Sequence, residues 1–168
     1  VYGDWLILNW DHEADSYLYA FDKRTGKERW KVARDDKTSW STPLVVEHEG
    51  KPQVVISATK RVRGYELATG RLIWECAGLS RNVVSSPVAG QGMVFAANSY
   101  DWQALLAIRL AGARGDITET DRVAWKLNRL TPYVSSPLLY GDTLYFLRHN
   151  QNVLSRFEPA TGQPRGEP

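Results

Sequence analysis

Apolar residues fall in short runs along this chain, and each run is bounded by turn-forming residues such as glycine, proline, asparagine and aspartate. Runs of this kind predict β-strands. The expected strands form groups of three, four, four and three: residues 5–9, 17–21 and 29–32; 43–46, 53–57, 63–67 and 72–75; 87–89, 93–97, 105–110 and 123–126; and 137–139, 143–147 and 154–157.

Two sequence patterns recur. Residues 20–30 (Ala-Phe-Asp-Lys-Arg-Thr-Gly-Lys-Glu-Arg-Trp) are echoed at residues 64–74 by Gly-Tyr-Glu-Leu-Ala-Thr-Gly-Arg-Leu-Ile-Trp. Ser-Thr-Pro at residues 41–43 returns as Ser-Ser-Pro at 85–87 and 135–137, at spacings of 44 and 50 residues. A period in the forties built from short strands is typical of propeller blades. We therefore predict an all-β propeller of four-stranded antiparallel blades, with about four blades at residues 1–38, 39–82, 83–132 and 133–168.

The repeated positions have physical roles. Glycine follows threonine at Gly26 and Gly70, where a tight turn needs a positive φ. A tryptophan follows each of these turns and can place its ring between neighbouring sheets, with its N–H directed at a backbone acceptor. The third repeat departs from this pattern, because residues 111–121 replace the turn; we expect them to form an elongated surface hairpin loop.

The pattern Ala-x-Asp-x-x-Thr-Gly-x-x-x-Trp resembles the tryptophan-docking motif of pyrroloquinoline-quinone-type (PQQ-like) propeller repeats. The matching residues are Ala20, Asp22, Thr25, Gly26 and Trp30 in the first copy, Thr69, Gly70 and Trp74 in the second, Ala107 and Trp125 in the third, and Thr161 and Gly162 in the fourth. The resemblance implies an exported, periplasmic bacterial protein and a propeller of eight blades, of which this chain is a part. It extends to the non-catalytic, BamB-like members of the superfamily.

The same superfamily contains quinoprotein dehydrogenases, which are similar to one another in an adjacent cysteine pair beneath PQQ and in a Glu/Asn/Asp shell around Ca²⁺. This chain has the single cysteine Cys76, so no such pair exists in it. The resemblance therefore favours a non-catalytic scaffold with no confirmed cofactor, PQQ and Ca²⁺ being the family possibility. The alternatives are a quinoprotein-like oxidoreductase whose site lies in other blades and the ligand-sensing ectodomain of a membrane receptor.

Composition narrows the class of partner. The net charge is +2 with both signs interspersed, which does not indicate nucleic acid or a charged membrane surface, and no apolar tract is long enough to span a bilayer. We expect protein partners. An open arc of blades also exposes sheet faces and edges, so we expect the chain to self-associate through them.

Propellers bind at the loops around their axis. Loops that join one blade to the next share a face with loops that join the second and third strands of a blade. Aromatic, arginine and polar residues in these loops give the candidate binding face: Trp40, Arg81, Asn82, Tyr100, Asp101, Trp102, Arg129, Tyr133, His149 and Asn150. The alternative for Trp40 and Tyr133 is that they fill gaps between blades.

Other chemistries have weaker support. His12, His48 and His149 lie on separate predicted elements without the spacing of metal ligands. The acidic residues at positions 11, 13 and 15 alternate in one loop and could bind Ca²⁺ through oxygen, but the spacing favours a solvated turn. The recurring serines at 85–86 and 135–136 follow the repeat, so we interpret them as scaffold residues rather than nucleophiles.

Overall fold

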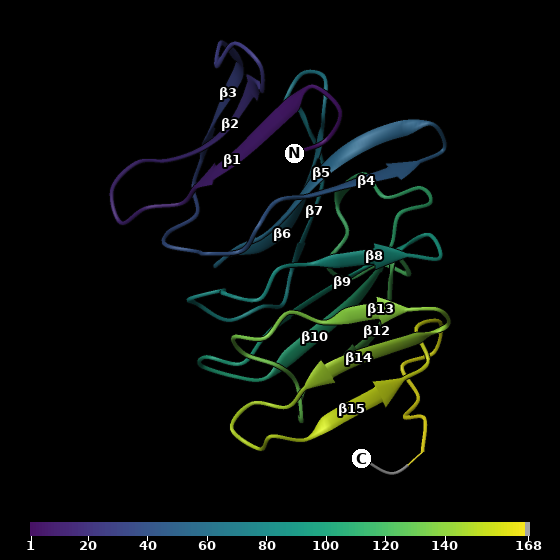
Figure 1. Ribbon diagram of the computed structural model, residues 1–168. Helices are drawn as coiled ribbons and strands as arrows, with labels where there is room; N and C mark the ends of the chain where they lie inside the picture. The colour runs from purple at the N-terminus through teal and green to yellow at the C-terminus, as the bar shows by residue number, and fades with distance from the viewer. Residues whose placement is uncertain (167–168) are drawn as a thin grey trace.

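The computed structural model describes residues 1–166, which form β-sheets and no helix, as Figure 1 shows. Four sheets follow one another along the chain and stack face to face in an arc. This is the predicted all-β propeller-type arrangement, present as an open arc rather than a closed ring. Within residues 1–166 there is no helix with the length and apolarity needed to cross a bilayer.

The strands of each sheet are consecutive in sequence, with one exception. The first sheet contains β1 (Trp5–Trp10), β2 (Ser16–Asp22) and β3 (Glu28–Arg34). The second contains β4 (Leu44–His48), β5 (Lys51–Ser57), β6 (Arg61–Glu66) and β7 (Leu72–Ala77). The third contains β8 (Val88–Gly90), β9 (Met93–Asn98), β10 (Ala104–Arg109) and β12 (Val123–Leu127). The fourth contains β13 (Leu138–Tyr140), β14 (Thr143–Leu147) and β15 (Leu154–Phe157).

The exception is β11 (Gly115–Asp116), which lies in the insertion of the third repeat. It pairs in parallel with β7, with Gly115 opposite Trp74, and so adds a fifth strand to the second sheet. Ile117 continues this pairing by donating its N–H to the carbonyl of Glu75 at 2.9 Å, and its own side chain is buried. The prediction of a surface hairpin loop is therefore wrong, because burial of apolar residues of the insertion places this segment against the preceding sheet.

The two end sheets carry the beginning of one further strand each. Tyr2 and Trp5 exchange both main-chain hydrogen bonds, at 3.0 and 2.8 Å, so Tyr2 lies where the innermost strand of the other sheets ends. Phe157 forms an isolated bridge with Pro164 at the position of an outermost strand. The sequence prediction of three strands in each of these sheets left out both bridges.

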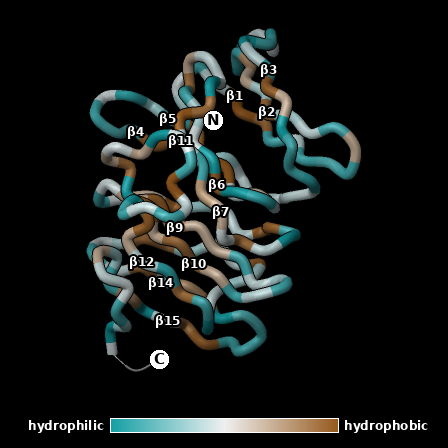
Figure 2. The backbone as a smooth tube through the Cα atoms, turned by 180° about the vertical axis from the view of Figure 1, so that it is seen from behind, coloured by the Kyte–Doolittle hydropathy of each residue, from teal (hydrophilic) through white to brown (hydrophobic). Residues whose placement is uncertain are grey.

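Apolar side chains fill the three interfaces between neighbouring sheets. Figure 2 shows the hydrophobic residues as brown segments of the backbone along the strands. Leu18 and Ile56 are buried between the first and second sheets, Cys76 and Leu106 between the second and third, and Phe146 belongs to the interface of the third and fourth. Each sheet thus buries both faces wherever it has two neighbours.

Two tryptophans form hydrogen bonds from one sheet to the next. The indole N–H of Trp30 donates to the carbonyl of Leu67 at 2.9 Å, and that of Trp125 donates to the carbonyl of Pro159 at 2.8 Å. Each ring lies over the glycine of the following turn, since a Cβ on Gly70 would come within 2.8 Å of Trp30 and one on Gly162 within 2.6 Å of Trp125. Glycine is needed there both for its positive φ and for this close approach.

The Ser-x-Pro segments before the innermost strands are joined to one another. The N–H of Thr42 donates to the hydroxyl of Ser86 at 2.8 Å, and the N–H of Ser86 donates to the hydroxyl of Ser136 at 3.0 Å. These bonds repeat from sheet to sheet, which gives the recurring serines a structural role.

Candidate functional site

The ten residues of the candidate binding face lie in loops on one side of the arc, between strands that end there. Trp40 is in the β3–β4 loop, Arg81 and Asn82 in the β7–β8 loop, Tyr100, Asp101 and Trp102 in the β9–β10 loop, Arg129 and Tyr133 in the β12–β13 loop, and His149 and Asn150 in the β14–β15 loop. The structure brings six of them into one contiguous group.

This group, which we call the loop cluster, consists of Arg81, Tyr100, Asp101, Tyr133, His149 and Asn150. The guanidinium of Arg81 donates to both carboxylate oxygens of Asp101, at 3.0 and 2.7 Å, and lies 5.7 Å from the ring centroid of Tyr100. The rings of Tyr100 and Tyr133 are 5.8 Å apart.

The cluster continues to the last loop. The imidazole of His149 packs edge-on against Tyr133 at 5.2 Å, and Asn150 hydrogen-bonds to His149 at 2.9 Å. Asn150 adopts a left-handed φ of 55°. One continuous series of contacts therefore joins loops from the second, third and fourth sheets.

Buried polar residues hold the first part of the cluster in place. The hydroxyl of Ser80 accepts the N–H groups of Tyr100 and Asp101, at 3.2 and 3.3 Å. The side-chain amide of Asn98 donates to the carbonyls of Ser80 and Arg81, at 3.0 and 2.6 Å. Ser80 and Asn98 are fully buried, so both loops are fixed before any partner arrives.

A second set of buried contacts supports the Tyr133 side. The hydroxyl of Ser99 contacts both the carbonyl and the hydroxyl of Thr131, and the N–H of His149 donates to the Thr131 carbonyl at 3.1 Å. Sequence reasoning missed these positioning residues. Ser80, Asn98, Ser99 and Thr131 are small polar residues beside loops, and nothing in their local pattern distinguishes them from ordinary turn residues.

The ion pair between Arg81 and Asp101 determines the charge distribution of the loop cluster. Hydrogen bonds from Arg81 lower the pKa of Asp101, and Asp101 in turn raises the pKa of Arg81. The side chain of Arg81 is 68% exposed and that of Asp101 is 25% exposed, so the guanidinium faces solvent more than the carboxylate does. The cluster presents a guanidinium and two tyrosine rings, which are groups enriched at protein interfaces, together with the imidazole of His149.

Four predicted residues lie outside the loop cluster. Trp40 is 57% exposed and lines a separate hollow of about 420 Å³ with Trp10 and His12, so it does not fill a gap between sheets. Arg129 and Asn82 lie in the same loops as cluster residues, without a side-chain contact to the cluster among the described interactions. Trp102 lines a groove of its own.

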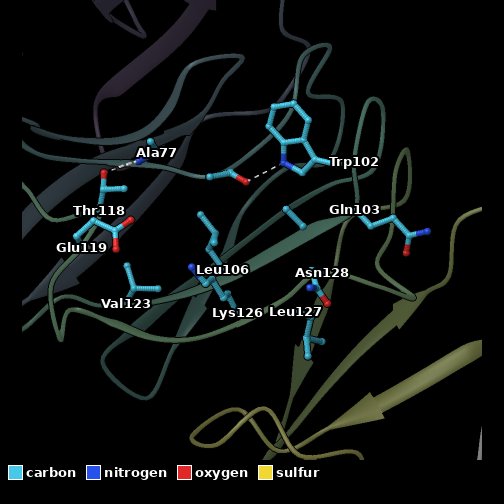
Figure 3. A pocket seen from close by; sticks show the side chains of 12 residues that line it. Ala77, Trp102, Gln103, Leu106, Thr118, Glu119, Val123, Lys126, Leu127 and Asn128 are labelled. Atoms are coloured by element: carbon cyan, nitrogen blue, oxygen red, sulfur yellow. Dashed lines mark hydrogen bonds between the residues drawn. The ribbon is translucent and has the colours of Figure 1, made fainter.

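That groove, the Trp102 groove, has a volume of about 500 Å³ and lies between the second and third sheets (Figure 3). Its walls come from Ala77 at the end of β7 and Gly78 just after it, from Thr118 and Glu119 in the insertion, and from residues of β10 and β12. The indole N–H of Trp102 donates to the Gly78 carbonyl at 3.3 Å across one end.

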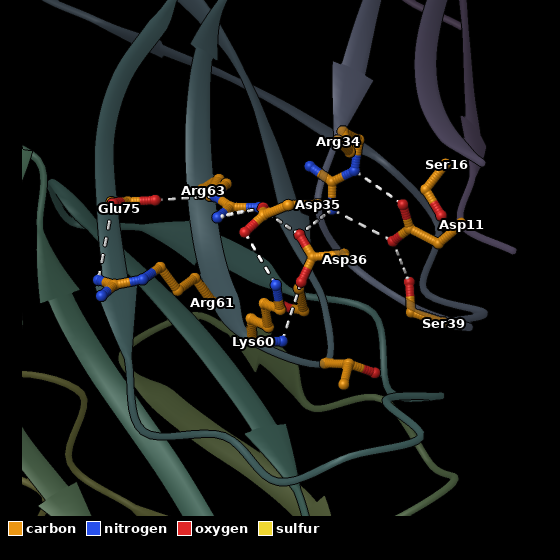
Figure 4. A network of polar contacts seen from close by, with 12 residues as sticks. Asp11, Ser16, Arg34, Asp35, Asp36, Ser39, Lys60, Arg61, Arg63 and Glu75 are labelled. Atoms are coloured by element: carbon orange, nitrogen blue, oxygen red, sulfur yellow. Dashed lines mark hydrogen bonds and ion pairs between the residues drawn. The ribbon is translucent and has the colours of Figure 1, made fainter. Parts of the chain in front are cut away.

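A buried ion network, drawn in Figure 4, joins the first and second sheets. The guanidinium of Arg34 donates to Asp11 at 2.7 Å and to Asp36 at 3.0 Å, and all three side chains are fully buried. Arg63 also donates to Asp36, and it donates to Glu75 at 2.9 Å. Asp11 is thus a structural ion-pair partner, and the expectation of a solvated turn is wrong for it.

Burial and pairing act against each other in this network. Burial is the largest single influence on Arg34 and acts to lower its pKa, but the hydrogen bond to Asp11 together with the charge interactions with Tyr65, Asp11 and Asp36 outweighs it, so the pKa of Arg34 is raised. Burial raises the pKa of Asp36 despite the nearby Arg34 and Arg63. The network is anchored by residues that lie far apart in sequence, which is why no local motif revealed it.

The single cysteine and the possible metal ligands are the other candidate groups in this chain. Cys76 is buried, and burial raises the pKa of its thiol to about 11, so it is a poor nucleophile near neutral pH. Within residues 1–166, no group of three or more His, Cys, Asp or Glu side chains is placed to hold a metal ion.

Comparison with known proteins places this geometry in a family. The family model described as outer membrane protein assembly factor BamB matches residues 14–167. No protein of curated function matches the sequence.

Solved structures resemble the fold at low sequence identity. BamB from Moraxella catarrhalis superposes with a TM-score of 0.69 at 16% identity, over 98% of this chain and 48% of that one. Quinohemoprotein alcohol dehydrogenase from Comamonas testosteroni gives 0.70 at 15% identity, over 96% and 32%. The WD40 domain of Neurospora crassa Pan2 gives 0.60 at 15%, over 95% and 48%. The chain therefore spans about half or less of the length of each of these proteins.

Proposed function

The chain belongs to the BamB-type family of PQQ-like repeat proteins, and from that premise we propose that it is a non-catalytic part of an exported propeller that binds protein partners through the loop cluster. The observation that carries this proposal is the continuous contact from Arg81 through Tyr100 and Tyr133 to His149. Aromatic and arginine side chains on a prepared surface are the anchors that protein interfaces use.

Preorganisation supports the same proposal. Ser80 and Asn98 hold the loops of Arg81 and Tyr100 by buried hydrogen bonds, so binding would order few additional side chains. Partner atoms would cover rings that already pack on one another. The structural similarity to Moraxella catarrhalis BamB, at 16% identity, supports the fold and leaves the partner to experiment.

The residues of this chain do not fit the PQQ and Ca²⁺ site of quinoprotein dehydrogenases. Cys76 is the single cysteine, it is buried, and the described residues contain no acidic group arranged around a metal position. The similarity to a quinohemoprotein alcohol dehydrogenase is the observation that favours an oxidoreductase whose site would lie in other blades. Calorimetric titration of PQQ into the full-length protein, with and without Ca²⁺, tests that candidate; saturable binding would support it.

The scaffold proposal is tested by partner recovery. The full-length protein, tagged and expressed in the organism that encodes it, is purified as wild type and with Tyr100→Ala plus Tyr133→Ala. We expect the recovery of specific partners to fall by more than about tenfold in the double variant, because truncating each interface anchor costs more than about 1 kcal/mol of binding free energy.

The matched control is Arg71→Ala. Arg71 forms an exposed ion pair with Glu66 at 3.2 Å, comparable to Arg81 with Asp101, but it lies in the β6–β7 turn on the opposite side of the arc. This variant should recover partners at the wild-type level. Equal partner recovery by the double variant and the wild type would contradict the proposal.

A further inference from the structure

The Trp102 groove combines features that the loop cluster lacks. Its floor is apolar, with Ala104, Leu106 and Val123 among the lining residues. Charged and amide side chains surround this floor. A volume of about 500 Å³ is within the range of ligand sites in proteins.

The indole at one end is exposed but fixed. Trp102 is 55% exposed, its N–H donates to the Gly78 carbonyl, and the two residues before it are held by the buried Ser80 hydroxyl. Figure 3 shows this ring apart from the wall formed by Thr118 and Glu119, with Leu106 between them. An exposed ring held in one orientation can receive an apolar side chain at low entropic cost.

Two exposed side chains of opposite charge also line the groove, Glu119 and Lys126. Among the described interactions, neither the carboxylate of Glu119 nor the ammonium of Lys126 has a hydrogen bond or an ion pair. A neutral ligand covering them would bury two charges without partners, which is unfavourable. A ligand with one basic and one acidic group would compensate both, so charge complementarity selects a dipolar occupant.

The main chain of this sheet adds a third feature. β12 is an end strand, paired with β10 on one side and with no strand of residues 1–166 on the other. On the second sheet the corresponding outer strand, β7, accepts the short extended segment β11 in parallel. The same type of edge in the neighbouring sheet is therefore suited to an extended backbone.

We propose that the Trp102 groove binds an extended peptide segment with an apolar side chain near Trp102 and with basic and acidic side chains facing Glu119 and Lys126. This proposal rests on the proposed function as a protein-binding scaffold and names the form of one partner element. Thr118 and Glu119 belong to the insertion that replaces the repeat's turn, so this departure from the repeat builds one wall of the site.

Selection of random linear peptides displayed on phage against the whole chain tests the proposal. Enriched sequences should carry both a basic and an acidic residue beside an aromatic or aliphatic one. A synthetic enriched peptide should bind about tenfold or more weakly to the Trp102→Ala variant, and weakly also to the Glu119→Gln plus Lys126→Gln variant.

Trp40→Ala is the matched control, because Trp40 is equally exposed but lies outside the groove; it should bind the peptide as the wild type does. Exchanging the charges, Glu119→Lys with Lys126→Glu, should restore binding of a peptide whose acidic and basic residues are exchanged. This rescue would not follow from a general loss of folding.

Three results would overturn the proposal. The first is selection that enriches no sequence over the Trp102→Ala chain, and the second is enrichment of peptides without charges that bind the double glutamine variant undiminished. The third is binding of a neutral saccharide such as maltotriose in place of peptides. Tyr133→Ala separates this test from that of the loop cluster, since it should reduce partner recovery while leaving peptide binding unchanged.

Discussion

The indole N–H of Trp74 donates a hydrogen bond to the side-chain oxygen of Gln53 at 2.9 Å, within one sheet. The equivalent tryptophans of the first and third sheets donate instead to main-chain carbonyls of the following sheet. Trp74 has no such turn to reach, because the insertion replaces the Thr-Gly turn of the third repeat. The second repeat has Gly64 where the motif has alanine, and this leaves room for the ring.

Gly64→Ala should therefore destabilise the fold. A Cβ at this position would lie 2.3 Å from the Trp74 ring, which is fully buried and cannot move aside. We expect a loss of about 3 kcal/mol in the free energy of unfolding, the upper end of the cost of overpacking. Urea denaturation measures it. In combination with Trp74→Leu the alanine should cost much less, and strictly additive effects would contradict the explanation.

Much of the fold follows from the sequence, because strands, turns and the repeat are local signals. Gly70 and Gly162 occupy turns that lie beneath a tryptophan ring of the preceding sheet, and both positions can be found from the repeated Thr-Gly pattern. The sequence did not predict β11. Its pairing with β7 depends on the burial of Ile117 against the neighbouring sheet, which is a contact between residues far apart in sequence.

The sequence predicts which loops the candidate residues occupy, but it does not predict the contacts between them. The loop positions of Tyr100 and Tyr133 follow from strand order, but their 5.8 Å separation depends on how two sheets stack. Asp11 illustrates the same limit: its loop is polar in sequence, yet its carboxylate is buried against Arg34.

Replacing Arg34 tests the ion network. Arg34→Met would leave the fully buried Asp11 and Asp36 without their shared cation, and breaking a buried pair from one side typically costs about 3–5 kcal/mol. Lys60→Met removes a cation of similar length from the exposed pair with Asp35, and it should cost less than about 1 kcal/mol. Chemical denaturation of both variants checks the difference, and similar losses would show that burial does not set the cost.

Acidification should destabilise the folded conformation of the insertion around Asp116. Hydrogen bonds from Thr118 and Arg61 lower the pKa of Asp116 from 3.8 to about 2. A carboxyl whose pKa is lower in the folded state stabilises that state above its unfolded pKa, and this stabilisation disappears as the pH falls from about 4 toward 2. The carboxyl carbon of Asp116 and the amide of Thr118, followed by NMR, should titrate together in that range. In Asp116→Asn the Thr118 amide should lose this transition, and its persistence would assign the transition to another group.

The outer faces of the end sheets predict self-association. Leu8 is 42% exposed on the first sheet and Tyr140 is 75% exposed on the fourth, each on a face without a neighbouring sheet among residues 1–166. Apolar faces of this kind favour association. Light scattering should show assemblies larger than 19.0 kDa, with Leu8→Lys plus Tyr140→Lys shifting them toward monomer. A monodisperse wild-type monomer would refute this prediction.

If the loop cluster is the partner-binding surface, a photo-cross-linking residue placed at Tyr133 should capture partners, whereas one placed at Arg71 in a separate variant should not. Both variants are expressed as full-length protein in the organism that encodes it. We expect discrete cross-linked partner proteins at Tyr133 and few or none at Arg71. Partners captured only at Arg71, or none at Tyr133 while the cross-linker there is shown to be active, would contradict it.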